Sequence, residues 1–153
     1  MAQSILVIDD DPDICEIVRI NLEGAGYNVS VATDGVAGLT AARTLLPDLI
    51  ILDVLMPGLD GWQVLEAIET DPVTAGRPVI MLTCKGGDQD VLRGLGQGAV
   101  EYFTKPFFPE NLVASVKILL EVFDASMRDQ RRQHLIARRQ RAIGMTTTAS
   151  VPF

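Results

Sequence analysis

The chain has 153 residues, 48% of them hydrophobic and 22% charged, which indicates one globular domain with a modest extension. No apolar run approaches the ~18 residues of a membrane span, and the first residues do not resemble a secretory signal, so we expect a cytoplasmic protein with no membrane contact. The net charge of −7 is carried by an acidic body, which argues against a nucleic-acid-binding surface there.

Short apolar runs alternate with segments of helical periodicity along the chain. The apolar runs predict five strands, at residues 4–9, 28–33, 49–53, 79–83 and 101–105. The intervening segments predict helices at residues 13–24, 34–45, 62–69 and 88–95, and a long final helix from residue 109 through 123 and beyond. This pattern predicts an α/β fold: a flavodoxin-like, doubly wound, five-stranded parallel sheet of order 2-1-3-4-5, with five helices and the last one extended.

Polar residues stand where four of these strands end. Asp9 and Asp10 end the first strand, Asp53 the third, Thr83 the fourth and Lys105 the fifth. In the order 2-1-3-4-5 these four strands are neighbours, and open α/β sheets bind ligands at the carboxyl ends of their strands. We therefore expect three carboxylates, a hydroxyl group and an ammonium group in one crevice.

This set of groups suits the chemistry of phosphate. Three carboxylates in one crevice raise each other's pKa unless a cation joins them, and Mg²⁺ with its preference for oxygen ligands relieves that conflict. The carboxylate of Asp53 can attack phosphorus and form an acyl phosphate. Mg²⁺, Lys105 and the Thr83 hydroxyl can meet the negative charge that develops.

Four stretches of the sequence together resemble the receiver domain of response regulators in two-component signalling. They are residues 5–12, 48–61, 79–83 and 102–107. Their order and spacing also agree with that family, since Thr83 follows Asp53 by 30 residues and Lys105 follows Thr83 by 22. The resemblance covers about residues 4–123.

The resemblance implies a phosphorylation-dependent switch. A histidine kinase or a phosphotransfer protein would phosphorylate Asp53 in a Mg²⁺-dependent reaction. Asp9 and Asp10 would hold the metal ion, Asp10 more directly, together with Asp53 and the backbone carbonyl group of Leu55. The chain would not be an enzyme, because its only chemistry would be its own phosphorylation and slow dephosphorylation.

The resemblance also implies how the signal leaves the site. Thr83 would move toward the phosphoryl group, Tyr102 would rotate, and Lys105 would pair with the phosphoryl group beside a cis peptide bond to Pro106. A downstream protein, or a second copy of the chain, would read the change at the face formed by the fourth helix, the fifth strand and the fifth helix.

Two positions differ from the polar or acidic residues that position an attacking water in this family. They are Leu55, two residues after Asp53, and Lys85, two residues after Thr83. Neither side chain offers a hydrogen-bond acceptor. We therefore expect a phosphoryl group on Asp53 to leave slowly.

Taken singly, these residues also have structural explanations. Residues 9–11 suit the start of a helix, where acids meet the positive end of its dipole. Asp53 and Lys105 suit turns, Thr83 has high strand propensity, and Tyr102 suits a half-exposed packing position. A coincidence of all of them at neighbouring strand ends is improbable, which favours the functional interpretation of the set.

Other classes of function fit less well. A phosphatase of the haloacid-dehalogenase type needs a second Asp two residues after its nucleophile, where Leu55 stands. A nucleotide-binding P-loop would have to follow the first strand, and the sequence there has no such motif. A constitutive scaffold would have lost site residues, and none is lost.

The charge changes sign near Asp124. Residues 1–124 carry seven Lys and Arg against 19 Asp and Glu, whereas residues 125–153 carry six Arg against one Asp. We therefore divide the chain into a receiver domain, 1–124, and a basic helical extension with a disordered tail, 125–153. The extension suits a solvated helix or the start of a linker, or else a basic arm for an acidic partner or nucleic acid. It is too short for a DNA-binding domain, so the chain is either a stand-alone receiver or part of a larger regulator.

Overall fold

The computed structural model of the protein describes residues 2–84, 96, 98–122 and 125–142. The helix expected at residues 88–95, Lys85 with its expected effect on loss of the phosphoryl group, and the disordered tail expected at 144–153 lie outside these residues. Within the described part of the chain, no helix combines the length and the apolar character needed to cross a membrane.

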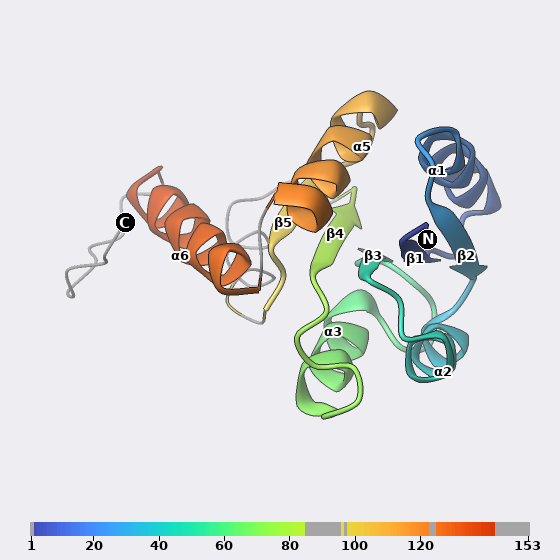
Figure 1. Ribbon diagram of the computed structural model, residues 1–153. Coiled ribbons are helices and arrows are strands. Elements are labelled where there is room, and N and C mark those ends of the chain that lie inside the picture. The colour runs from blue at the N-terminus through green and yellow to red at the C-terminus, as the bar shows by residue number, and fades with distance from the viewer. Residues whose placement is uncertain (1, 85–95, 97, 123–124, 143–153) are drawn as a thin grey trace.

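The core of the fold is a five-stranded parallel sheet (Figure 1). Its strands are β1 Ser4–Ile8, β2 Asn28–Ala32, β3 Leu49–Asp53, β4 Val79–Thr83 and β5 Glu101–Thr104. They follow the order β2-β1-β3-β4-β5, which confirms the predicted topology. Every residue of β3 and β4 is buried, as expected for continuous apolar runs in strands covered on both faces.

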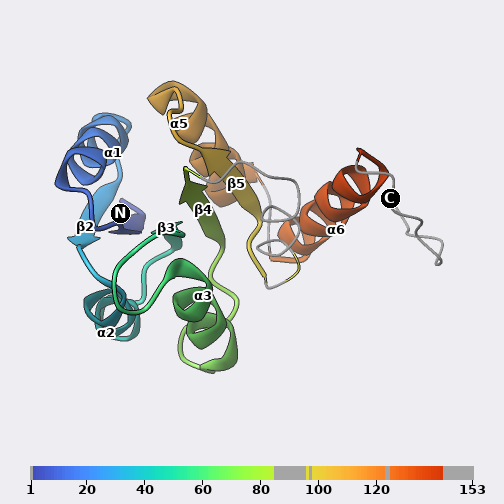
Figure 2. The same ribbon diagram turned by 180° about the vertical axis from the view of Figure 1, so that it is seen from behind.

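Helices cover both faces of the sheet. The bounds are α1 Pro12–Gly24, α2 Gly35–Leu45, α3 Gly61–Thr70 and α5 Pro109–Lys117. Figures 1 and 2 show α1 and α5 on one face and α2 and α3 on the other. The sheet has one hydrophobic cluster on each face, and successive strand residues pack into them alternately. Leu6 and Ile50 pack in the cluster on the α3 side, whereas Val7 and Ile51 pack in the cluster on the α1 side.

An aspartate caps the start of each of the first three helices. Asp11, Asp34 and Asp60 accept hydrogen bonds from backbone N–H groups of the first turn, at 2.8–2.9 Å. Asp60 also forms a reciprocal capping box with Gln63. The side chain of Asp11 thus caps α1, whereas those of Asp9 and Asp10 do not cap this helix and lie at the end of β1.

The end of the described chain differs from the single extended helix that we expected. α5 ends at Lys117, a π-helical stretch follows at Ile118–Val122, and the basic segment forms a separate helix, α6 Ala125–Ala142. Figures 1 and 2 show α6 displaced from α5 and lying beyond β5. Good helix formers predict the helical conformation of this segment, but its position depends on tertiary contacts.

Candidate functional site

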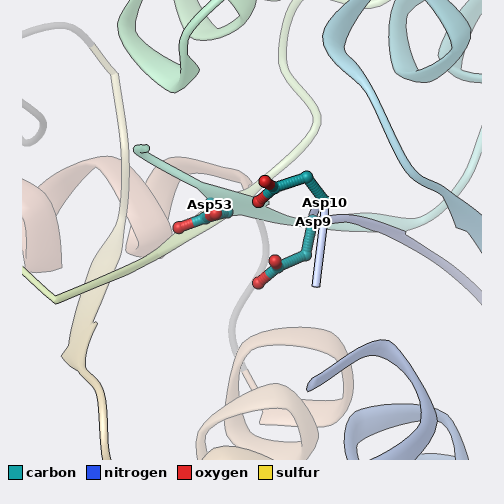
Figure 3. A group of neighbouring side chains, drawn as sticks. All are labelled: Asp9, Asp10 and Asp53. Carbon is teal, nitrogen blue, oxygen red and sulfur yellow. The ribbon is translucent and has the colours of Figure 1, made fainter. Parts of the chain in front are cut away.

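Three aspartates meet where β1 and β3 end. Ile8 pairs with Leu52 in the parallel register, so the next residues along each strand, Asp9 and Asp53, are neighbours. Asp10 follows directly, and one carboxylate oxygen of each aspartate lies within 4.8 Å of those of the other two. Figure 3 shows Asp9 and Asp10 together at the end of β1, beside Asp53 from β3.

The three carboxyl groups differ in their exposure to solvent. Asp9 is fully buried and Asp53 is 3% exposed, whereas Asp10 is exposed. A carboxylate oxygen of Asp9 accepts a hydrogen bond from the backbone N–H of Asp11 at 2.9 Å. The thiol of Cys15 donates to the backbone carbonyl of Asp9 at 3.2 Å. These contacts fix Asp9, while Asp10 forms the open side of the cluster.

Lys105 supplies a positive charge to the cluster from the residue after β5. Its Nζ lies 2.8 Å from Oδ2 of Asp9 and 3.3 Å from Oδ1 of Asp53. The Lys105 backbone N–H donates to the carbonyl of Thr83 at 2.7 Å, and the peptide bond to Pro106 is cis. The expected crevice thus contains Lys105, but its direct contact with Asp9 was not expected, because β5 and β1 are not adjacent and only a long side chain bridges them.

Burial and like charge together perturb the Asp53 carboxyl group. Burial is the larger cause and the charge of Asp9 the second, and they raise the pKa of Asp53 to about 7 against the opposing effects of Lys105 and the Leu55 N–H. Burial lowers the pKa of Lys105, but its hydrogen bonds and charge interactions with Asp9 and Asp53 outweigh burial and leave that pKa raised. One ammonium group therefore does not balance the three neighbouring carboxylates.

The donor set fits a hard divalent cation. Its carboxylate oxygens converge within a few ångströms, Asp9 and Asp53 are held in place, and Asp10 remains accessible to solvent and to an incoming ion. Mg²⁺ favours such oxygen ligands and retains several waters.

Thr83 and Tyr102 lie on the two strands next to β3. Asp53 pairs with Leu82, so Thr83 stands one position further along β4, with its side chain fully buried. Tyr102 pairs with Met81 inside the sheet and is half-buried against the core cluster on the α3 side. Thr83 is thus at the strand ends with the aspartates, while Tyr102 lies further back along β5.

Two residues near Asp53 shape its surroundings. Leu55 is 46% exposed, and its backbone N–H donates to Oδ1 of Asp53 at 3.4 Å. A Cβ atom at Gly61 would collide with the carbonyl oxygen of Asp53 and with Cα of Val54. The Gly61 N–H also donates to the Val54 carbonyl at 2.8 Å. Gly61 therefore lets α3 begin directly against the end of β3, a role that we did not expect from the sequence.

Comparisons with known proteins agree with this geometry. Residues 5–117 match the response regulator receiver domain. The chain is 48% identical over 120 residues to the DNA-binding dual master transcriptional regulator RpaA of Synechocystis sp., a match that covers 78% of the chain and 50% of that protein. The chain spans about half the length of the curated relatives that it matches.

Solved structures show the same fold. A putative response regulator from Chloroflexus aurantiacus has a TM-score of 0.74 at 38% identity and covers 78% of this chain and 98% of its own. The chemotaxis protein CheY4 of Vibrio cholerae also has a TM-score of 0.74, at 32% identity, and covers 78% of this chain and 100% of its own. The chain therefore belongs to the response regulator receiver domain family of two-component signalling.

Proposed function

We propose that Asp53 accepts a phosphoryl group from the phosphohistidine of a histidine kinase or phosphotransfer protein. The observation that carries this proposal is the buried carboxylate of Asp53 beside two further carboxylates and 3.3 Å from the ammonium group of Lys105. A structural ion pair would need one carboxylate for each ammonium group. The excess of carboxylates favours a site that recruits a cation and a phosphoryl group.

The transfer exchanges one bond to phosphorus for another. A carboxylate oxygen of Asp53 attacks the phosphorus, the P–O bond of an acyl phosphate forms, and the P–N bond to the donor imidazole breaks. The electron pair of that bond stays on the imidazole nitrogen, which takes up a proton. Lys105 neutralises the charge on the phosphoryl oxygens, and the Thr83 hydroxyl donates a hydrogen bond to one of them.

Asp9, Asp10, Asp53 and the carbonyl group of Leu55 would hold Mg²⁺. The bound ion supplies positive charge to the phosphoryl oxygens and allows the neighbouring carboxylates to be ionised together. Asp9 would be the fixed ligand, because its carboxylate is buried and hydrogen-bonded, and Asp10 the ligand on the solvent side. The buried Asp9 also contacts Lys105, so it positions both positive charges of the site.

The proposed output is a change in the affinity for a protein partner. Thr83 and Tyr102 lie on adjacent strands, so a movement of Thr83 toward a phosphoryl group can repack Tyr102 on β5. The partner, or a second copy of the chain, would bind at the face that we expect from the fourth predicted helix, residues 88–95, together with β5 and α5. Relatives such as RpaA are DNA-binding regulators, and we propose that the part matched here is the switch and does not contact DNA.

Phosphorylation by a small donor tests this function. Wild-type protein is incubated at pH 8 with Mg²⁺ and acetyl phosphate and compared with Asp53→Asn and with Asp13→Asn. Asp13 is an exposed acid in the first turn of α1 and is the matched control. Intact mass spectrometry should show the added phosphoryl group in wild type and Asp13→Asn and not in Asp53→Asn. Equal phosphorylation of all three proteins would show that Asp53 is not the acceptor.

A further inference from the structure

Helix α6 is docked against the body of the protein and is not a solvated extension. Leu135 and Ile136 pack against the core cluster that contains Ile68 and Ala99. Ala137 is only 2% exposed. A helix that projected into water would leave its alanine side chains exposed, so this burial shows a contact between α6 and the cluster on the α3 side of the sheet.

A charge interaction accompanies the apolar contact. Glu69, near the end of α3, is half-buried. Burial raises the pKa of its carboxyl group, and the positive charge of Arg132 on α6 offsets only part of that increase. The Glu69 side chain lies so close to Gly98 that a Cβ atom at Gly98 would be 2.6 Å from its Cδ. The Glu69 side chain therefore lies beside the residues that precede β5, with Arg132 as a nearby counter-charge.

The opposite side of α6 faces solvent. His134 and Arg138, which are four residues apart on that side, are exposed, whereas Arg132, Leu135, Ile136 and Ala137 are at least partly buried. The covered residues Arg132 and Ile136 are four apart, as expected for one side of an α-helix. The contact is therefore made by one defined face of the helix, and a substitution on the other face provides a control.

β5 joins this contact to the Asp53 site. Tyr102 of β5 is partly buried against the same core cluster as Leu135 and Ile136. Three residues further along, Lys105 contacts both Asp9 and Asp53. Because a packed cluster tolerates few alternative arrangements, a change at the end of β5 that moves Tyr102 must also repack the surface on which α6 rests.

We propose that the docking of α6 and the occupation of Asp53 by a phosphoryl group disfavour each other, so that α6 is an autoinhibitory contact. This inference rests on the proposed function of Asp53. With α6 docked, Lys105 lies closer to Asp9 than to Asp53. A phosphoryl group on Asp53 draws the ammonium group of Lys105 onto its own oxygens and away from Asp9, which shifts the end of β5. A phosphoryl group on Asp53 thus lowers the equilibrium constant for docking of α6 by some factor. By thermodynamic linkage, undocking of α6 must raise the affinity of the site for the phosphoryl group by that same factor.

Charge reversal on each face of α6 tests the linkage in the full chain. Arg132→Glu places a like charge near Glu69 and should loosen α6, whereas Arg138→Glu makes the same change on the exposed face. The dissociation constant of beryllofluoride, a non-hydrolysing mimic of the phosphoryl group, is measured by calorimetry at fixed Mg²⁺. We expect beryllofluoride to bind Arg132→Glu about fivefold more tightly than Arg138→Glu. The double variant Arg132→Glu/Glu69→Gln should return toward the control value.

Amide hydrogen exchange reports the docking directly. Residues 132–140 should exchange slowly in wild type and Arg138→Glu and faster in Arg132→Glu, and beryllofluoride should accelerate their exchange in wild type. Equal beryllofluoride affinities for Arg132→Glu and Arg138→Glu, or fast exchange of this segment in wild type, would overturn the inference while leaving the proposed function intact. Failure of every variant to bind beryllofluoride would instead contradict the proposed function of Asp53, and the inference with it.

Discussion

Asp53 combines two unfavourable conditions for a carboxylate, burial and a neighbouring negative charge. Only 3% of the residue is exposed, and Asp9 lies beside it. Lys105 offsets part of the cost by contacting both aspartates. Any ligand that brings positive charge to this site stabilises the ionised form of Asp53. We infer that Mg²⁺ binding and ionisation of Asp53 favour each other for this reason.

The raised pKa of Asp53 makes the stability of the metal-free protein depend on pH. Because the pKa in the folded state is about 7 and the ordinary value is 3.8, the folded protein binds the proton more tightly than the unfolded chain. The resulting stability is fully present below about pH 4 and is lost as the pH rises through 7. Asp53→Asn removes this dependence and should raise the free energy of unfolding at pH 8 by about 1–2 kcal/mol.

Urea unfolding in EDTA between pH 5 and pH 8 measures this effect. The difference between Asp53→Asn and wild type should shrink as the pH falls to 5. Asp13→Asn, which changes an exposed carboxylate, should show little difference at any pH in this range. A constant difference between Asp53→Asn and wild type across the range would contradict the assigned environment of Asp53.

Leu55 is expected to slow the loss of the phosphoryl group. Its exposed side chain lies two residues beyond Asp53 and has no hydrogen-bonding atom to orient an attacking water. Leu55→Gln should therefore accelerate hydrolysis of the acyl phosphate by about tenfold. The decay is followed by mass spectrometry after removal of the donor, with Val73→Gln, also at an exposed apolar side chain, as the control. A half-life of seconds in the wild-type protein would contradict the expectation.

At the scale of elements, the junction between β3 and α3 depends on the absence of a side chain at Gly61. Gly61→Ala forces a Cβ atom against the backbone of Asp53 and Val54, and it should lower the free energy of unfolding by about 2–3 kcal/mol. Gly24→Ala is the matched control, because a Cβ atom there meets nothing within 4 Å, and it should be neutral or slightly stabilising. Urea unfolding curves of the two variants that coincide would refute the close approach at Gly61.

The strands and their order were predictable because the pattern of residues decides them locally. A strand buried on both faces, such as β3, needs a continuous apolar run, and the polar residue that ends the run also marks the strand end. The right-handed crossover rule then places Asp9, Asp53 and Thr83 at one edge of the sheet. The contacts of these residues follow from topology and not from details of packing.

The position of α6 and the contact of Lys105 with Asp9 were not predictable in the same way. The apolar face of α6 is short, centred on residues 135–137, and such a face does not specify which surface it covers. The reach of Lys105 across two strands depends on side-chain conformation in the folded site. Both features arise from tertiary contacts between segments far apart in the sequence.

At the scale of the whole molecule, the cation requirement of the site should appear in global stability. Mg²⁺ competes with the proton on Asp53, so added Mg²⁺ should stabilise the protein more at pH 8 than at pH 5.5. With free Mg²⁺ at ten times its dissociation constant, the gain is about 1.4 kcal/mol. Thermal unfolding with and without EDTA measures it, and Asp10→Asn should reduce the gain. Equal stabilisation of wild type and Asp10→Asn would argue against a metal ion at this cluster.

Locating the phosphoryl group on the chain tests directly whether Asp53 is the acceptor. Protein phosphorylated with acetyl phosphate and Mg²⁺ is reduced with borohydride, which converts an acyl phosphate into a stable alcohol, and is then mapped by peptide mass spectrometry. We expect a single modified residue, Asp53, on the peptide that contains the end of β3. Modification at another residue, or none at any residue, would contradict it.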